Sequence, residues 1–376
     1  MSLLAYIPAA LTCVALAFYI ANLVALRSWR KQAVPPAAAF PVSILKPLMG
    51  CDPEMHEAFR WHCLQEYEAP YEIIFGVNDA QDEAVPFVQR LQAEFPQHSI
   101  SLVVCSDVLG ANRKVSNLVQ MVRHARYAHV LVSDSDITVP SGYLSGVMRW
   151  FVDPQVGLVT CLYRARSAKT IWSKLESLGV LLDFMPGALT ARIVEGRVRF
   201  GLGSTLAVSR TALEKIGGFE TLVNYLADDY ELANAIVKAG YQVVVPVTIV
   251  ETHVRDYNFR EFWDHQLRWG RTVRSSRFGG YWGLIVTFGL FWAVVWAIVS
   301  AGSAIALAAI TAVLVLRWIL LGAYAAALED VHANRSWWLV PLRDLISPIV
   351  WFCSIAGNKI VWRGETFRLR NGNLFH

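Results

Sequence analysis

The segment His129-Val-Leu-Val-Ser-Asp134-Ser-Asp136-Ile137 decides the fold of this chain. Its beginning, Ala128 to Val132, is short, apolar and rich in branched residues, which is typical of a buried strand in a parallel sheet. Asp134 and Asp136 follow where this strand is expected to end. Ligands of open α/β sheets bind outside the carboxyl ends of the strands, so both acids are predicted to face a binding site.

Asp134 and Asp136 are separated by one small serine, so they can present carboxylate oxygens to a single divalent cation. Mg²⁺ in particular favours one or two carboxylates together with substrate phosphates. The same residues also suit an ordinary turn that closes a strand, because Asp and Ser are common turn formers. The rest of the chain has to decide between a metal site and a simple turn.

The residues on either side of this segment predict an alternating α/β sheet. Further strands are expected at 41–45, 71–77 and 99–104, with one helix at 81–95 and another that follows from the stretch 110–117 and ends near Arg126. Asn78 and Asp79 stand at the carboxyl end of the second strand. This alternation, with acids at strand ends, is typical of nucleotide-binding sheets.

Two common nucleotide-binding classes are disfavoured. The chain has no phosphate-loop signature, and Gly201-Leu-Gly203-Ser-Thr-Leu206 lacks the third glycine of the dinucleotide fingerprint. Residues 201–205 are either a flexible functional loop or a tight turn between strands. A bound nucleotide is therefore expected to be held through its diphosphate by a metal ion on Asp134 and Asp136.

Apolar runs explain why 55% of the residues are hydrophobic. Leu3 to Leu26 is uncharged and long enough to cross a bilayer. Tyr281 to Ala327 is broken only by Arg317 and predicts two helices with a turn at 300–303. A third run, Leu345 to Val361, is shorter, and residues 171–191 are polar enough to lie along the bilayer surface. The chain is therefore expected to be an integral, multi-pass membrane protein.

The basic residues predict the orientation of the polar domain. Arg27, Arg30 and Lys31 follow the first apolar run, which favours a retained anchor whose C-terminal side is cytoplasmic. Four arginines precede the second membrane block and place that end of the domain in the cytoplasm too: Arg268, Arg271, Arg274 and Arg277. The polar domain is therefore predicted to be cytoplasmic.

The C-terminal tail poses a conflict. Two spans within 281–327 return the chain to the cytoplasm, so a full crossing at 345–361 would place the basic residues of the tail outside. The positive-inside rule disfavours that arrangement. We therefore predict a re-entrant or interfacial helix at 345–361 that keeps residues 362–370 beside the polar domain.

Composition excludes several other classes. The six cysteines are scattered without a Cys-x-x-Cys pair, so neither a zinc site nor a disulfide framework is expected. The net charge of +4 is modest, and the basic cluster beside the membrane fits topology and anionic lipid, so no nucleic-acid partner is predicted. The predicted organisation is an anchor (1–27), a linker (28–39), an α/β domain (40–278), membrane helices (279–362) and a basic tail (363–376).

Several separated motifs share one known pattern. Asp79, Asp134-x-Asp136, Asp229 and Arg268-Trp269 resemble, in this order, the D, D, D, (Q/R)xxRW pattern of inverting membrane glycosyltransferases, which have a GT-A fold. The position three before Arg268 is His265, where that pattern has Gln or Arg. The chain is most similar to the ceramide glucosyltransferase family over about residues 40–372, through Ser43-Ile-Leu-Lys-Pro-Leu-Met-Gly50, Gly157-Leu-Val, Ala227-Asp-Asp-Tyr230 and 362–370. Bacterial enzymes that glycosylate hopanoid lipids look similar as well.

This resemblance implies a GT-A domain with transmembrane helices and a metal-dependent hexosyltransferase activity. A sugar would move from a UDP-sugar, with UDP-glucose favoured, to the hydroxyl group of a lipid in the bilayer, with inversion. Asp134 and Asp136 would hold Mg²⁺ or Mn²⁺, Asp229 would act as the base, and Asp228 would cap a helix. Asp79 and Lys114 would contact the nucleotide, and Arg268 with Trp269 would bind the departing diphosphate.

Other functions stay open at this stage. A hopanoid lipid N-acetylglucosaminyltransferase would use the same residues, and a processive polysaccharide synthase would need more membrane segments for a channel. A catalytically inactive membrane scaffold could retain the fold, although every acid of the pattern is present. The acceptor (ceramide, a hopanoid or diacylglycerol) is not specified by the sequence, and neither is the choice between UDP-glucose and UDP-N-acetylglucosamine.

Overall fold

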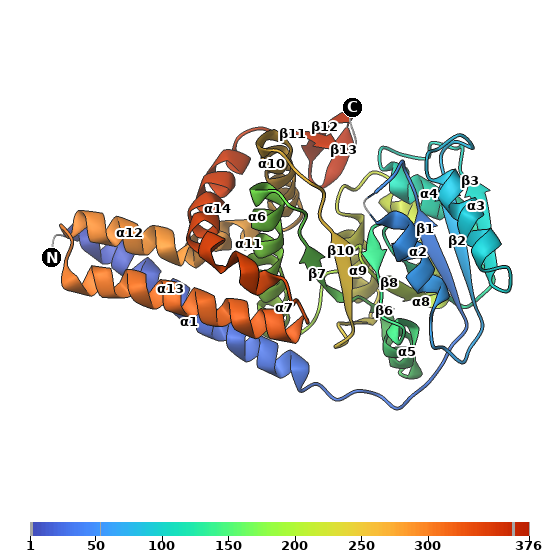
Figure 1. Ribbon diagram of the computed structural model, residues 1–376, viewed down its shortest axis with the longest axis horizontal. Coiled ribbons are helices and arrows are strands. Elements are labelled where there is room, and N and C mark those ends of the chain that lie inside the picture. Colours follow the sequence, from blue (N-terminus) through green and yellow to red (C-terminus); the bar gives the residue numbers. More distant parts are fainter. Residues whose placement is uncertain (1–2, 53, 363–364, 376) are drawn as a thin grey trace. The chain divides into compact units, whose positions relative to one another are not determined.

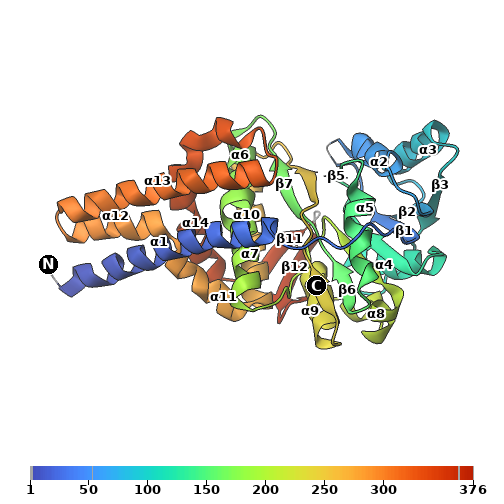
Figure 2. The same cartoon turned by 90° about the horizontal axis from the view of Figure 1, so that it is seen from below.

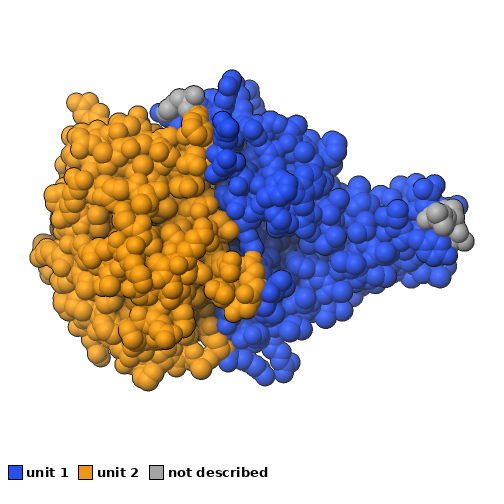
Figure 3. Space-filling model, turned by 180° about the vertical axis from the view of Figure 1, so that it is seen from behind, with its two compact units in different colours: residues 1–31, 165–194, 256–371 blue, residues 32–164, 195–255, 372–376 orange. Residues whose placement is uncertain are grey.

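The computed structural model describes residues 3–52, 54–362 and 365–375, so Arg363 and Gly364 of the predicted tail lie outside the described residues. The chain forms two compact units (Figure 3). Unit 1 comprises Met1–Lys31, Ala165–Val194 and Asp256–Asn371, and unit 2 comprises Gln32–Arg164, Glu195–Arg255 and Gly372–His376. The domain boundaries expected from the sequence stay predictions.

Unit 2 is built on a seven-stranded sheet of order β3-β2-β1-β4-β8-β6-β9. Its strands are β1 (Val42–Pro47), β2 (Tyr71–Val77), β3 (Ser99–Val104), β4 (His129–Val132), β6 (Val156–Val159), β8 (Leu206–Ser209) and β9 (Gln242–Val244). The first four in spatial order run parallel, whereas β8 is antiparallel to both of its neighbours. The four strands predicted from the sequence are confirmed.

A second, three-stranded sheet has the order β5-β10-β7, with β5 (Ile137–Thr138), β10 (Ile249–His253) and β7 (Leu162–Arg166). The helices of unit 2 are α2 (Met55–Cys63), α3 (Val85–Glu94), α4 (Arg113–Met121), η1 (Val122–His124), α5 (Tyr143–Met148), η2 (Arg149–Val152), α8 (Arg210–Lys215), η4 (Phe219–Leu222) and α9 (Asp228–Lys238). The helix expected from residue 81 begins later, because Asp79 and Asp82 accept backbone hydrogen bonds two residues ahead and form turns.

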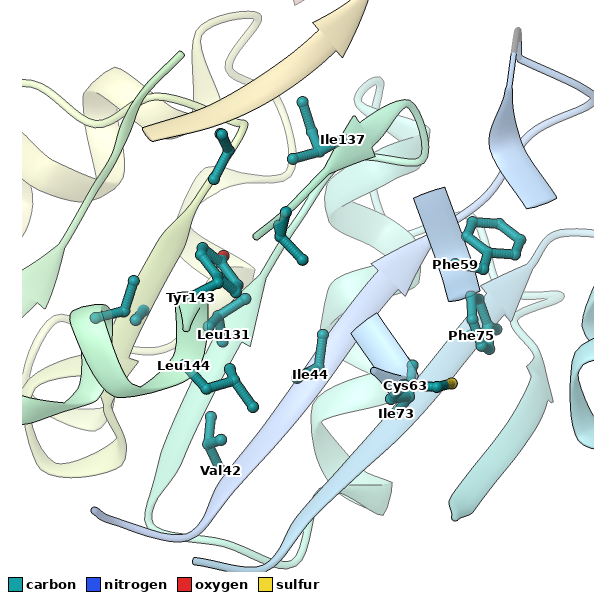
Figure 4. Close-up of a cluster of buried hydrophobic side chains, with 14 of the residues drawn as sticks. Val42, Ile44, Phe59, Cys63, Ile73, Phe75, Leu131, Ile137, Tyr143 and Leu144 are labelled. Carbon is teal, nitrogen blue, oxygen red and sulfur yellow. The ribbon is translucent and has the colours of Figure 1, made fainter. Parts of the chain in front are cut away.

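The main core of unit 2 lies on β1, β2 and β4 (Figure 4). All six residues of β1 are buried, including the polar Ser43 and the charged Lys46. Phe59 of α2 packs on Phe75 of β2 with ring centroids 4.7 Å apart. Each such side chain removed from water contributes roughly 1.5–3 kcal/mol. The strand ends that carry the polar residues are therefore fixed by a rigid framework.

Unit 1 is mainly helical. It contains α1 (Leu3–Arg30), α6 (Ile171–Gly179), η3 (Val180–Phe184), α7 (Met185–Val194), α10 (Phe259–Ser276), α11 (Phe278–Gly283), η5 (Leu284–Thr287), α12 (Gly289–Val299), α13 (Ala304–Ala327), η6 (Ala333–Leu339), α14 (Val340–Ile355) and the antiparallel pair β11 (Lys359–Trp362) and β12 (Glu365–Arg370). Helices α1, α12 and α13 lie side by side in both ribbon views (Figures 1 and 2). The turn predicted at 300–303 separates α12 from α13, and Ser303 caps the second helix.

Among the described residues, four helices are long and apolar enough to cross a membrane: Leu4–Arg30, Ile171–Val194, Ala304–Ala327 and Arg335–Ile355. A bent pair, Phe278–Thr287 with Gly289–Val299, would make a fifth. The prediction that 171–191 is too polar to span and lies on the bilayer surface is wrong in its first part, because Ile171–Val194 is long and apolar enough to cross. Asp183, one of the acids of this stretch, is paired with Arg317 and Arg343.

The apolar helix α13 tolerates the charge of Arg317 because two acidic side chains pair with it. The side chain is 2% exposed, and its guanidinium lies 2.5 Å from Asp344 Oδ1 and 2.8 Å from Asp183 Oδ1. Arg343 Nε donates to Asp183 at 3.2 Å, so two arginines share two acids. Losing one partner of a buried pair typically costs about 3–5 kcal/mol, which makes this cluster a strong constraint on helix register.

Candidate active site at the carboxyl ends of the strands

Asp134 and Asp136 lie in the loop between β4 and β5, and the backbone of this loop is held by Lys46. The Lys46 ammonium, buried at the end of β1, donates to the carbonyl of Asp134 at 2.9 Å and to Ser133 Oγ at 3.2 Å. Burial lowers the pKa of Lys46 to about 7, against the opposing charges of Asp134 and Asp136. The loop is thus attached to the neighbouring parallel strand.

The next two residues of the loop are held by other elements. Ser135 Oγ donates to Asp52 Oδ2 at 2.5 Å, and Asp52 also pairs with Arg255. Thr252 of β10 donates to Asp136 Oδ2 at 2.5 Å. The turn that the sequence also allowed is present, since Ile137 N donates to Asp134 O at 3.4 Å. The loop is therefore both a turn and a carboxylate pair set in a fixed framework.

The two carboxylates repel each other, with Asp136 partly buried and the Asp134 side chain 37% exposed. Burial, and then the charge of Asp134, raise the pKa of Asp136 to about 6. Within residues 3–52, 54–362 and 365–375, no group of three or more His, Cys, Asp or Glu side chains is arranged to hold a metal ion. Two hard oxygen donors that complete their set with substrate phosphates are what Mg²⁺ commonly uses, so the residues present fit such a cation.

Lys114 connects the carboxylate loop to helix α9. Its ammonium lies 2.8 Å from Asp134 Oδ1 and 3.2 Å from Asp228 Oδ2. Burial disfavours the charged form, but the charges of Asp134, Asp228 and Asp229 outweigh it and raise the pKa of Lys114 above its ordinary value. A permanent positive charge therefore stands between the two groups of acids.

The expected cap role of Asp228 is wrong. Helix α9 begins at Asp228, its N-cap residue is Ala227, and no side chain caps it. The carboxylate of Asp228 instead accepts from Asn112 Nδ2 at 3.3 Å and pairs with Lys114, because these groups compensate its burial. Asp228 supports the cluster from within the first turn of the helix.

Asp229 occupies a different environment. Its Oδ2 accepts from Gly203 N at 3.0 Å and its Oδ1 from Tyr230 N at 2.7 Å. Burial, followed by the charge of Asp228, raises the pKa of Asp229 to about 7, while Lys114 opposes the shift. A carboxylate that titrates near neutral pH is suited to accept a proton from a substrate.

Gly203 touches both groups of acids through its backbone. Its N–H donates to Asp229, and its carbonyl accepts from Asp134 N at 3.3 Å. A Cβ on this residue would lie 2.6 Å from Asp134 Oδ2 and 3.3 Å from Lys114 Nζ. The loop at 201–205, for which a simple turn was the alternative, therefore links the candidate metal ligands to the candidate base.

The remaining predicted residues make other contacts. Asp79 follows β2 as expected and is exposed, with Oδ1 accepting from Gln81 N at 2.9 Å. Arg268 and Trp269 lie on α10 of unit 1, where the Trp269 ring is 5.0 Å from that of Phe184. His265 Nδ1, on the same helix, lies 3.4 Å from Glu176 Oε1. The roles assigned to Asp79, Arg268 and Trp269 stay predictions.

Sequence reasoning missed the residues that position the acids. Lys46 could have been found, since a charge at the end of a mostly apolar strand requires a partner if it is buried. Thr252 and Asp52 carry no comparable local signal, because their partners lie 116 and 83 residues away in sequence.

A model of Glycosyl transferase family 21 matches residues 7–375 of this chain. Ceramide glucosyltransferase 3 of Caenorhabditis elegans is 26% identical over 229 residues, covering 61% of this chain and 49% of the relative. Ceramide glucosyltransferase 1 of the same animal is 22% identical over 347 residues, covering 88% and 72%. The match thus spans about half the length of the first relative. The resemblance to the ceramide glucosyltransferase family that the sequence showed is confirmed.

The structure resembles that of a mannosyltransferase from Pyrobaculum calidifontis in complex with GDP-Man and Mn²⁺. The TM-score is 0.55 at 19% sequence identity, and the alignment covers 93% of this chain and 99% of that one. At this identity the similarity concerns the fold alone. The GT-A fold expected from the sequence is confirmed.

Replacing Gly203 by Ala should weaken Mn²⁺ binding by about tenfold or more, which corresponds to roughly 1.4 kcal/mol. The added methyl group would displace the Asp134 carboxylate, which its Cβ would approach to 2.6 Å. Isothermal titration of the purified protein with Mn²⁺ in the presence of saturating UDP measures this change. Gly142→Ala is the matched control, because a Cβ there meets no atom within 4 Å. Equal affinities in the two variants would contradict the proposed geometry.

Proposed function

We propose, since the chain belongs to glycosyl transferase family 21, that it transfers a sugar from a UDP-sugar to the hydroxyl group of a membrane lipid. The observation that carries this proposal is the junction at Gly203, which joins a carboxylate pair suited to a divalent cation with a carboxylate suited to accept a proton. The apolar helices of unit 1 would give the enzyme access to lipid. The names of the relatives favour ceramide as the acceptor and UDP-glucose as the donor.

Asp134 and Asp136 would hold the cation, for which Mg²⁺ and Mn²⁺ are both suitable. Such an ion, when bound, supplies positive charge that stabilises the diphosphate leaving group. The Mn²⁺ bound with GDP-Man in the Pyrobaculum calidifontis mannosyltransferase supports this assignment. Lys46 and Thr252 would keep the two carboxylates in place, so that little reorganisation is needed when donor binds.

Asp229 would take the proton from the lipid hydroxyl as that oxygen attacks the anomeric carbon. The new bond forms between the acceptor oxygen and the sugar, and the bond between the sugar and the diphosphate breaks. The N–H groups of Gly203 and Tyr230 donate to Oδ2 and Oδ1 of Asp229, respectively, and so fix the orientation of this carboxylate. General base catalysis of this kind typically contributes about 10² to 10⁴ in rate.

The residues outside this cluster are assigned by family resemblance. Arg268 would bind the departing diphosphate with Trp269 beside it, and Asp79 would contact the uracil or ribose. Lys114, whose ammonium is held by Asp134 and Asp228, would face the donor phosphates. A hopanoid acceptor with UDP-N-acetylglucosamine as donor is the alternative within the same chemistry.

We also propose a multi-pass protein with a cytoplasmic catalytic domain. Arg271 and Arg274 of α10 donate to backbone carbonyls at the C-terminal end of α14, including those of Ala356 and Ser354. These bonds bring the end of α14 to the helix that carries the predicted cytoplasmic arginines. They support a tail on the cytoplasmic side.

Purified protein in lipid nanodiscs should form a glycolipid from one combination of donor and acceptor. UDP-glucose and UDP-N-acetylglucosamine are each supplied with ceramide, a hopanoid or diacylglycerol, and the lipid extract is analysed by mass spectrometry. Excess EDTA and the Asp136→Ala variant should both abolish transfer, because the charge on the leaving diphosphate is then not neutralised.

Asp153→Ala serves as the control for this assay, since Asp153 is an exposed acid of the same unit. Full activity in excess EDTA would contradict the metal site. Binding of the nucleotide sugar without transfer to any acceptor would favour an inactive scaffold.

The rate of transfer should rise with pH and level off above about 7, because Asp229 must lose its proton to act as a base and burial raises its pKa to about 7. Asp229→Asn should abolish transfer while nucleotide-sugar binding stays near normal. Asp228→Asn should stay active, and its transfer rate should rise at lower pH than in the wild type, since the charge of Asp228 raises the pKa of Asp229. An inactive Asp228→Asn beside an active Asp229→Asn would show that the base is assigned to the wrong residue.

A further inference from the structure

The last strand of the chain, β13 (Asn373–Phe375), is bonded to the segment that leads into α9. Leu374 N donates to Asn224 O at 2.7 Å, Leu226 N donates to Gly372 O at 3.0 Å, and Tyr225 forms an antiparallel bridge with Asn373. Leu374 and Leu226 are 3% and 7% exposed. All these residues belong to unit 2, so strand β13 is an integral part of this unit.

The same segment, residues 223–226, is also held from the other side. Asn112 N donates to Val223 O at 2.8 Å, and Ala111 N donates to Asn224 Oδ1 at 3.1 Å. The Asn112 side chain donates to the carbonyl of Tyr225 at 2.7 Å. Residues 223–226 are therefore fixed between the loop before α4 and the C-terminal strand.

Asp229 follows this segment directly. Helix α9 has Ala227 at its N-cap position, and this residue provides no side-chain cap. Asp229 is held directly by the N–H groups of Gly203 and Tyr230. The bonds to residues 223–226 add to these by fixing the backbone immediately before the first turn.

We infer that the C-terminal strand is a clamp that positions Asp229 for proton transfer by holding residues 223–226. The inference rests on the proposed function for its catalytic consequence. Strand β13 is a positioning element. Among the residues that the structure describes, no hydrogen bond joins β13 to the Asp229 carboxylate. The clamp also requires the end of the chain to be in the same compartment as the acid cluster, in agreement with the predicted cytoplasmic tail.

Deleting residues 373–376 from the full-length protein tests the clamp. Hydrogen–deuterium exchange should rise in the peptide that contains Gly203, whose N–H donates to Asp229 Oδ2. The kcat for transfer should fall by about 10- to 100-fold with little change in the KM for the UDP-sugar, since a shift of about 1 Å in a catalytic group can cost 10²-fold.

Two point variants refine the test. Leu374→Ala keeps the chain length and truncates a buried side chain. It should raise the exchange at Gly203 and lower kcat, each by less than the deletion does. Phe375→Ala is the control, because Phe375 belongs to the same strand and is 51% exposed. It should leave exchange and kcat unchanged.

The outcomes separate the clamp from the proposed function. Raised exchange at Gly203 in the truncated protein, with no transfer by the wild type, would uphold the clamp and contradict the function. Unchanged exchange at Gly203 and unchanged kcat would overturn the clamp. An equal rise of exchange in the core strand β2 would also overturn it, because β13 would then stabilise the unit in general without positioning Asp229.

Discussion

The repulsion between closely placed carboxylates is the constraint on which the candidate site of unit 2 depends. Asp134, Asp136, Asp228 and Asp229 come from two separate parts of the chain and lie within electrostatic reach of one another. Placing charge away from water is costly unless it is paired, and Lys114 lies between the two pairs. The strand framework, the Gly203 loop and the clamp at the C-terminus hold together groups that would otherwise separate.

The same constraint divides the acids by chemistry. Asp134 and Asp136 repel each other next to strand ends, which favours a divalent cation with phosphate oxygens as further ligands. Asp229 is desolvated and lies beside Asp228, so its pKa of about 7 suits proton transfer. Lys114 and the Gly203 backbone connect the two functions, so a change at either residue should affect both. Burying the Asp229 charge costs free energy of folding, and the same burial raises the pKa of this carboxyl to about 7, as a base acting at neutral pH would require.

The sequence predicted the features that depend on local pattern. Strands β1, β2, β3 and β4, the acids after β4 and the turn between α12 and α13 all follow from hydrophobic runs and strand-end residues. The prediction that Asp228 caps helix α9 was wrong, because its partners are Asn112 and Lys114, which lie more than a hundred residues earlier in the sequence. Thr252 is 116 residues from Asp136, and Arg317 is matched by acids on two other helices, so neither partnership leaves a local signal. Patterns in sequence report neighbours along the chain, whereas this site is built from neighbours across it.

The central claim is that Asp229 and the carboxylate pair act together in one direct displacement at the sugar. The anomeric configuration of the glycolipid tests this claim most directly, since a single attack inverts the reacting carbon. Proton NMR of the product formed from an α-linked UDP-sugar measures that configuration through the coupling of the anomeric proton. The account predicts a β-glycoside. An α-glycoside would contradict it, because retention requires two successive displacements or a different geometry of attack.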